Sequence, residues 1–249
     1  MTIAACASLV ERGDPDRFAA VMAAPVADRA RLFVLYAFNL EIARAPWVTR
    51  EPLIAEMRLQ WWRDVVAEDR PPAHEVAGPL HALIREADLP VAVLGALIAA
   101  RQWDIYSDPF ADQDAFDAYL QATGAGLMWL AAVALGAPPP VEPAARDLGW
   151  ATGLAGFLRA VPALQARGRV PLVDGSKAAL VSLAQQGLLR IGQARRTGIP
   201  RGAALAAWQT ARLLRRVVSD PRAVAEGRVQ VSEFDRRRLL LWQAITGRF

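Results

Sequence analysis

Two carboxylates in the segment WDIYSDPF have a spacing that could hold a metal ion. Asp104 and Asp108 stand four residues apart, which on a helix would put both side chains on one face, where they could share Mg²⁺. However, Asp108 precedes Pro109, and proline disfavours the α conformation of the residue before it. A turn or helix-cap role is therefore the favoured interpretation, with metal binding as the alternative.

The segment RLQWWRD, which starts at Arg58, combines charged and aromatic side chains on one predicted helix. Trp61 and Trp62 cannot face the same core, because neighbouring residues are about 100° apart around a helix axis. One of them should pack inside, while the other lines a groove or contacts a second helix. Packing anchors and ligand-binding side chains both remain open as interpretations.

A third stretch is notable for the residues that it lacks. No Asp or Glu occurs from Leu148 to Val173, whereas Arg159, Arg167 and Arg169 fall within it. Arginine offers planar, multidentate hydrogen bonding to carboxylate or phosphate groups. Cysteine and histidine chemistry is improbable, because Cys6 is the single cysteine and the two histidines have no metal-binding companions.

The elements that must position these residues are predicted to be helices of one all-α domain covering residues 1–249. Asp14 and Pro15 mark a helix start, and Pro71 and Pro72 mark a loop. Pro162 is expected to interrupt a helix. The predicted helices are 27–45, 51–69, 75–87, 90–106, 111–135, 142–159, 176–192, 202–219 and 232–246.

Charge is unevenly distributed along the chain. The net charge is +4, yet the segment from Arg190 onward holds 13 arginines against four acidic residues. Its amphipathic helices could lie on an anionic membrane surface or on an acidic partner, or could simply be solvated. No recognisable helix-turn-helix pattern accompanies the charge, so nucleic acid is not an expected partner.

The most apolar stretches, 91–100 and 127–137, are shorter than the roughly 20 residues that a membrane-spanning helix needs. The first residues also lack the basic start of a signal peptide. We expect a cytoplasmic protein with at most peripheral membrane contact.

Five segments in order, FVLYAFNLEIA, RLQWWRD, ARQWDIYSDPF, YLQATGAGL and GLAGFLRAVPALQARGRVPL, resemble the squalene/phytoene synthase family over nearly the whole chain. The resemblance implies an isoprenoid synthase-like helical bundle around a central cavity. Active members of that family hold Mg²⁺ with two acidic segments on facing helices and join two allylic diphosphates.

Both acidic segments differ in this chain. The family's acidic positions of the first segment are occupied by Ala43, Arg44 and Trp47. Those of the second segment are occupied by Ala160, Ala163 and Leu164. The local charge now favours an anion over a cation. We therefore expect no metal site, no catalytic residue and no cofactor.

The pattern is more similar to a non-catalytic branch of the family, which includes a mitochondrial assembly factor of respiratory complex I. This implies a membrane-peripheral assembly role at the inner face of a bacterial inner membrane, with complex I subunits or assembly intermediates as partners. One alternative is a Mg²⁺-dependent prenyltransferase that acts on farnesyl or geranylgeranyl diphosphate through Glu41, Glu51, Asp104 or Asp108. Another is a lipid or prenyl-diphosphate carrier without chemistry. The residues expected to line the cavity and bind an anion are Tyr36, Arg44, Arg58, Trp61, Arg159 and Arg169.

Overall fold

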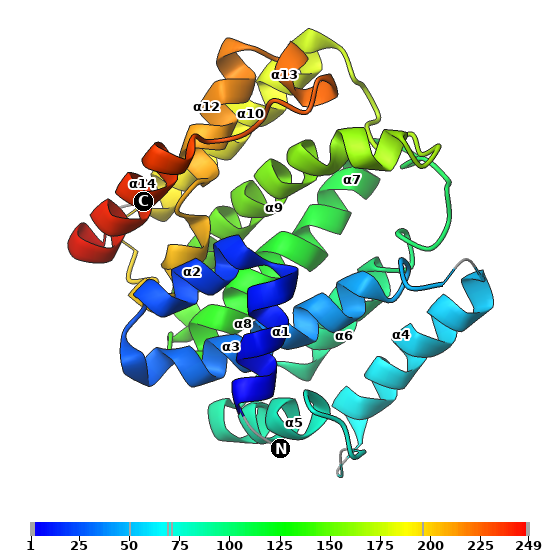
Figure 1. Cartoon of the computed structure of the whole chain (residues 1–249), viewed down its shortest axis with the longest axis vertical. Helices are drawn as coiled ribbons and strands as arrows, with labels where there is room; N and C mark the ends of the chain where they lie inside the picture. Colours follow the sequence, from blue (N-terminus) through cyan, green and yellow to red (C-terminus); the bar gives the residue numbers. More distant parts are fainter. Residues whose placement is uncertain (1–2, 50, 69, 71, 196, 248–249) are drawn as a thin grey trace.

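The computed structural model describes all residues except 1–2, 50, 69, 71, 196 and 248–249, and the described part is helical without a strand (Figure 1). The α-helices are α1 (Ile3–Gly13), α2 (Pro15–Ala23), α3 (Val26–Arg44), α4 (Pro52–Ala67), α5 (Ala77–Ala87), α6 (Val91–Ala100), α7 (Gln113–Leu120), α8 (Gly126–Ala134), α9 (Glu142–Gln165), α10 (Lys177–Ala194), α11 (Arg201–Ala204), α12 (Thr210–Ser219), α13 (Arg222–Ala225) and α14 (Glu233–Thr246). A π-helical turn, η1 (Gln121–Ala125), joins α7 to α8, and the short 3₁₀ turns are η2 (Pro139–Val141) and η3 (Leu205–Ala207).

Among the described helices, four begin at a residue whose side chain caps the first turn. Asp14 accepts a hydrogen bond from the backbone N–H of Arg17 at 2.9 Å, and Asp112 accepts one from Ala115 at 2.8 Å. Ser176 and Ser232 cap α10 and α14 in the same way. Each cap satisfies a backbone donor that the first helical turn leaves free.

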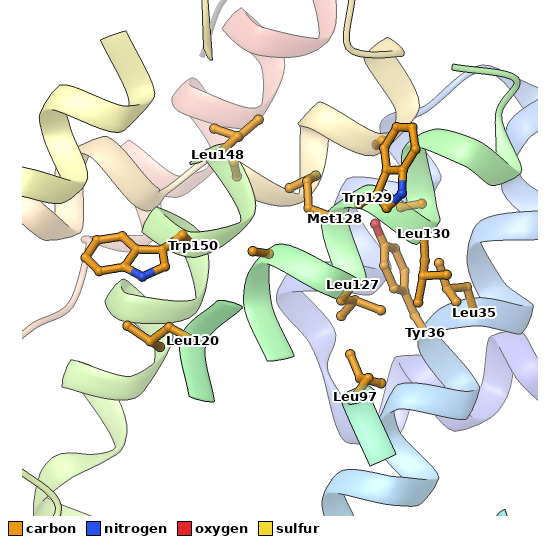
Figure 2. Packing of buried hydrophobic residues seen from close by; sticks show 14 of the residues in the cluster. Leu35, Tyr36, Leu97, Leu120, Leu127, Met128, Trp129, Leu130, Leu148 and Trp150 are labelled. Atoms are coloured by element: carbon orange, nitrogen blue, oxygen red, sulfur yellow. The ribbon is translucent and has the colours of Figure 1, made fainter. Parts of the chain in front are cut away.

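The core lies where α3, α8 and α9 meet. Nearly the whole second half of α3 is buried, as is most of α8, so these helices are apolar on all sides rather than on one stripe. Figure 2 shows Tyr36 of α3 among Leu35, Leu127 and Leu130. The helix α9 packs against α8, η1, α10, α12 and α13. No helix of the described residues is long and apolar enough to cross a membrane.

A close backbone approach joins η1 to α9. A Cβ atom added to Gly124 would lie 2.6 Å from the carbonyl oxygen of Gly149 and 2.7 Å from the Cα of Gly153. These positions therefore require glycine. The π-turn, a form common at functional sites, is held directly against α9 by this contact.

Three helix predictions are wrong in part. The helix expected over 90–106 ends at Ala100 and continues as turns, in which the carbonyl oxygens of Trp103 and Tyr106 accept hydrogen bonds from Arg169. Pro162 does not interrupt α9, which continues to Gln165 with Val161 and Leu164 buried against the core. The helix expected over 202–219 is divided into α11, η3 and α12. The predicted end at Asp69 lies outside the described residues, and α4 ends at Ala67.

Candidate functional site

A cavity of about 300 Å³ lies between α3, η1, α8 and α9 and the turns after α6. Apolar side chains form much of its wall, including Leu120, Leu127, Met128 and Phe157. Its polar lining residues are Arg17, Tyr36, Asn39, Arg101, Asp104, Tyr119, Thr123 and Thr152. An apolar enclosure with a few converging polar groups is the usual form of a small-molecule site.

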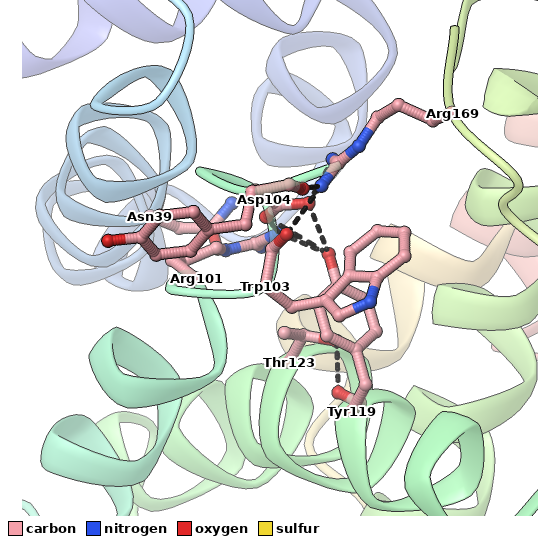
Figure 3. Close-up of polar contacts among 8 residues, drawn as sticks. Asn39, Arg101, Trp103, Asp104, Tyr119, Thr123 and Arg169 are labelled. Carbon is pink, nitrogen blue, oxygen red and sulfur yellow. Dashed lines mark hydrogen bonds and ion pairs between the residues drawn. The ribbon is translucent and has the colours of Figure 1, made fainter. Parts of the chain in front are cut away.

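The carboxylate of Asp104 is the centre of a buried polar network (Figure 3). Arg101 donates to Asp104 at 3.2 Å, and the Tyr119 hydroxyl lies 3.2 Å from both carboxylate oxygens. Arg169 forms an ion pair with Asp104 at 3.8 Å and also donates to the carbonyls of Trp103 and Tyr106. The buried Arg169 and the largely buried Arg101 therefore share one carboxylate, and these three side chains together carry a net positive charge.

Aromatic rings hold the turn that carries Asp104. Trp103 stacks on Phe110 with ring centroids 4.0 Å apart, and both rings contact Tyr119 and Phe157. The guanidinium of Arg169 lies over the Trp103 ring at 4.3 Å. Packed rings and cation–π contact fix the turn at the cavity edge.

Several buried polar atoms at this site have no hydrogen-bond partner. They include the Tyr36 hydroxyl, the Nε of Arg101 and the Nη1 of Arg169. Burial raises the pKa of Tyr36 to about 12, so its hydroxyl stays protonated and can donate. Burial also raises the pKa of Tyr119. Unpaired buried groups are costly, and a ligand with hydrogen-bonding atoms would satisfy them.

The positions that correspond to the family's metal-binding acids surround this cavity only in part. Ala43, Trp47, Ala160 and Leu164 line it. Arg44 and Ala163 are exposed and lie outside its lining. Across the two segments, the guanidinium of Arg167 lies 4.4 Å from the centroid of the Trp47 ring, and that of Arg169 lies 5.8 Å away. The indole of Trp47, at one of these positions, therefore lies beside two cations and no carboxylate takes its place.

These residues do not fit a magnesium cluster. Mg²⁺ is bound through carboxylate and other oxygen ligands, and the one carboxylate in the cavity lining, Asp104, is already engaged by two arginines. Among the described residues, no group of three or more Asp, Glu, His or Cys side chains is placed to hold a metal ion. The alternative ligands Glu51 and Asp108 are exposed, and Glu41 lines a different pocket.

The residues predicted to bind an anion in one cavity are distributed over several places. Tyr36 lines the cavity, and Arg169 reaches its edge through Asp104. Arg58 and Trp61 line a separate pocket of about 230 Å³ with Glu41, Ala45, Trp62 and His74.

Two further arginines lie away from the cavity. Arg159 is exposed and pairs with Asp16 at 3.1 Å, and Arg44 is exposed at the end of α3. The expectation of a single site for all six residues is wrong, because each side chain follows the face of its own helix, and those faces diverge.

Sequence reasoning missed Arg101, Tyr119, Asn39 and Thr123 as cavity residues. Arg101 donates to Tyr119 at 3.0 Å and to Asn39 at 3.5 Å, and Thr123 donates to the carbonyl of Tyr119 at 2.6 Å. A usable signal was present, since these residues fall in the segments FVLYAFNLEIA, ARQWDIYSDPF and YLQATGAGL. For Asp104 a turn position is correct, although its carboxylate also balances two arginines.

The helical bundle and its cavity define a protein of the isoprenoid synthase-like class. The model of the squalene/phytoene synthase family matches residues 10–174, and the chain belongs to this family. A solved dehydrosqualene synthase shares the fold with a TM-score of 0.82 at 15% identity, covering 96% of this chain and 94% of that one. Squalene synthase HpnC from Alicyclobacillus acidocaldarius has a TM-score of 0.72 at 14% identity, and the match covers 86% of this chain and 92% of that one.

Curated relatives have a different description from these synthases. The chain is 28% identical to "NADH dehydrogenase (ubiquinone) complex I, assembly factor 6" of Bos taurus, over 66% of this chain and 51% of that protein. It is 27% identical to the Homo sapiens protein of the same name, over 63% of this chain and 48% of that protein. The Drosophila melanogaster homolog is 28% identical over 74% and 58%. The chain spans about half the length of the curated relatives it matches.

Proposed function

We propose that this chain is a membrane-peripheral assembly factor for respiratory complex I that uses the squalene/phytoene synthase fold without condensation chemistry. Its partners would be complex I subunits or assembly intermediates, at the inner face of a bacterial inner membrane. The similarity to complex I assembly factors from three animals supports this role.

The observation that carries the proposal is the contact between the two segments that correspond to the family's metal-binding acids. Trp47, which lines the cavity, lies against Arg167, and Asp104 is paired with Arg101 and Arg169. Loss of diphosphate from an allylic substrate requires positive charge that is free to act on the leaving group. Here the donor set supports a binding or assembly role better than ionisation of a substrate.

The test is deletion of the gene in its host. Assembled complex I, measured on native gels and by membrane NADH oxidation, should fall and should recover when the wild-type gene is returned. Normal amounts of assembled complex I in the deletion strain would overturn the assembly role. In parallel, purified protein with Mg²⁺ and farnesyl diphosphate should release no diphosphate, and release would establish the prenyltransferase alternative.

A second candidate function is non-catalytic binding of a lipid or prenyl compound in the cavity. The buried hydroxyl of Tyr36 and the free Nε of Arg101 favour it, because they leave hydrogen-bond donors beside an apolar wall. Farnesyl diphosphate without Mg²⁺ should raise the melting temperature of the wild type, and Tyr36→Phe should reduce the shift. If neither farnesyl diphosphate nor a long-chain fatty acid shifts the melting temperature, this candidate fails.

A further inference from the structure

The outward face of α14 is unusually apolar for an exposed helix. Phe234, Leu241, Trp242 and Ile245 are 76%, 62%, 59% and 69% exposed. At about 100° per residue, these four side chains and Arg238 fall within roughly 100° of arc around the helix. We call these five residues the α14 face. Large apolar side chains gathered on one exposed face mark an interaction surface rather than scattered surface residues.

Contacts on the opposite side of α14 hold this face outward. Gln243 is 3% exposed and donates to the carbonyl oxygen of Ala204 at 2.9 Å. Arg236 forms an ion pair with Asp16 of α2. Figure 1 shows α14 at the edge of the molecule, beside α2. The helix is therefore docked through these polar contacts and through the partly buried Leu239, Leu240 and Ala244, and the α14 face points away from the protein core.

Positive charge adjoins the α14 face. A groove of about 650 Å³ between α12 and α14 is lined by Trp208, Trp242 and the arginines Arg195, Arg212, Arg215 and Arg238. Asp235 contacts two of these arginines, Arg212 at 3.8 Å and Arg238 at 2.9 Å. Arg215 has no hydrogen bond or ion pair within the described residues. The described lining of the groove thus contains four arginines and no acidic residue, so the groove is basic.

We propose that the α14 face and the adjoining groove bind the surface of an anionic phospholipid bilayer. Phe234, Leu241, Trp242 and Ile245 would enter the boundary between headgroups and acyl chains, and the groove arginines would contact lipid phosphates. An apolar face with tryptophan and flanking arginine is the pattern of helices that lie in the plane of a membrane interface. An acidic protein partner would match the charge of the groove but would not offer an apolar environment to the four large side chains of the α14 face. The inference rests on the peripheral membrane role in the proposed function and adds the surface that performs it.

Vesicle flotation with the full chain tests the proposal. Wild-type protein should float with vesicles made from equal parts phosphatidylglycerol and phosphatidylcholine, and should bind phosphatidylcholine alone more weakly. Raising the salt concentration should weaken the binding, because exposed charges are screened. The double variant Phe234→Ala, Trp242→Ala should lose about tenfold or more in partitioning. Arg215→Gln should lose about fivefold.

Matched variants on another face provide the controls. Leu53 and Met57 of α4 are 67% and 63% exposed, so the double variant Leu53→Ala, Met57→Ala removes similar exposed apolar area. It should bind vesicles like the wild type. All variants should keep the helical circular dichroism signal and melting temperature of the wild type, so that loss of folding is excluded.

Three results would overturn the proposal. The first is equal vesicle binding by the wild type and the α14-face double variant. The second is a concentration-dependent dimer, seen by sedimentation velocity, that the same variant abolishes, because the occupant would then be a second copy of the chain. The third is the absence of binding to anionic vesicles. If the protein fails to bind anionic vesicles but the deletion strain lacks complex I, the membrane surface is overturned and the assembly role stands. If the protein binds the vesicles but the deletion strain has normal amounts of complex I, only the assembly role is overturned.

Discussion

In the cavity, the side chains of Arg101 and Arg169 are 14% and 4% exposed and share the carboxylate of Asp104. On α14, the side chains of Arg237 and Arg238 are 82% and 63% exposed, and each pairs with an acid on its own helix. The first pair organises the turns after α6 and would be costly to leave without a counter-charge. The second pair is solvated, contributes little to stability and is available to a partner. The same residue type therefore fixes structure in one region and presents charge in the other.

The largest expected effect comes from removing the shared carboxylate. Asp104→Asn leaves Arg101 and Arg169 buried without a counter-charge, and we expect the free energy of unfolding to fall by about 3 to 5 kcal/mol. Urea denaturation followed by circular dichroism measures the loss. The control is Asp220→Asn on the surface, where pairing with Arg216 and Arg228 should be worth less than about 1 kcal/mol. Similar losses in the two variants would break the comparison.

A second prediction compares two glycines of the cavity wall, one packed against another backbone and one with open space beside it. Gly124→Ala forces a Cβ against the backbone of Gly149 and Gly153, and we expect a loss of about 1 to 3 kcal/mol. Gly156 also lines the cavity but has nothing within 4 Å of an added Cβ. Gly156→Ala should therefore stabilise α9 by about 0.5 to 1 kcal/mol. Thermal unfolding of both variants tests whether η1 and α9 meet as closely as the structure shows.

A third prediction concerns Asp16, which joins the two regions through Arg159 of α9 and Arg236 of α14. Burial acts to raise the pKa of Asp16, but hydrogen bonds from Gln209 and Arg159 and the charge of Arg236 outweigh it and lower the pKa below the ordinary value of 3.8. The carboxylate therefore stabilises the fold at neutral pH, and this stabilisation disappears as the pH falls through the lowered pKa.

Asp16→Asn should accordingly cost up to about 1 kcal/mol at neutral pH. The difference from the wild type should shrink as the pH is lowered below 3.8. Urea denaturation at neutral pH and at pH values below 3.8 measures this difference in the free energy of unfolding. Tryptophan fluorescence, to which Trp208 near Asp16 contributes, is a second probe. A difference that grows on acidification would show that Asp16 does not hold α14 through its charge.

The smallest effect on stability is expected for Arg215→Gln. Arg215 is a groove residue without an ion pair in the described part of the chain. The free energy of unfolding of the variant should therefore stay within about 0.5 kcal/mol of the wild-type value. Vesicle affinity should nevertheless fall. A clear loss of stability would show that Arg215 stabilises the fold, as the arginines of the cavity do, and is not simply a solvated charge.

Helix type and most helix positions followed from the sequence, because capping residues, prolines and apolar spacing act locally. Asp14 caps the helix whose start it was expected to mark. The end of α6 could not be predicted in this way. The turns that follow α6 are held by Arg169, which lies more than 60 residues further along the chain and donates hydrogen bonds to their carbonyl oxygens.

The sequence by itself determined the helical class of the protein, its family and the absence of carboxylates at the positions of the family's acidic segments, since these are properties of residue identity and order. Only the tertiary structure decided that Asp104 would be shared by two arginines and that Trp47 would contact Arg167. It also separated Arg58 and Arg159 from the cavity and turned the apolar arc of α14 outward. These outcomes depend on which helix faces meet, and that choice is made by packing across the whole fold.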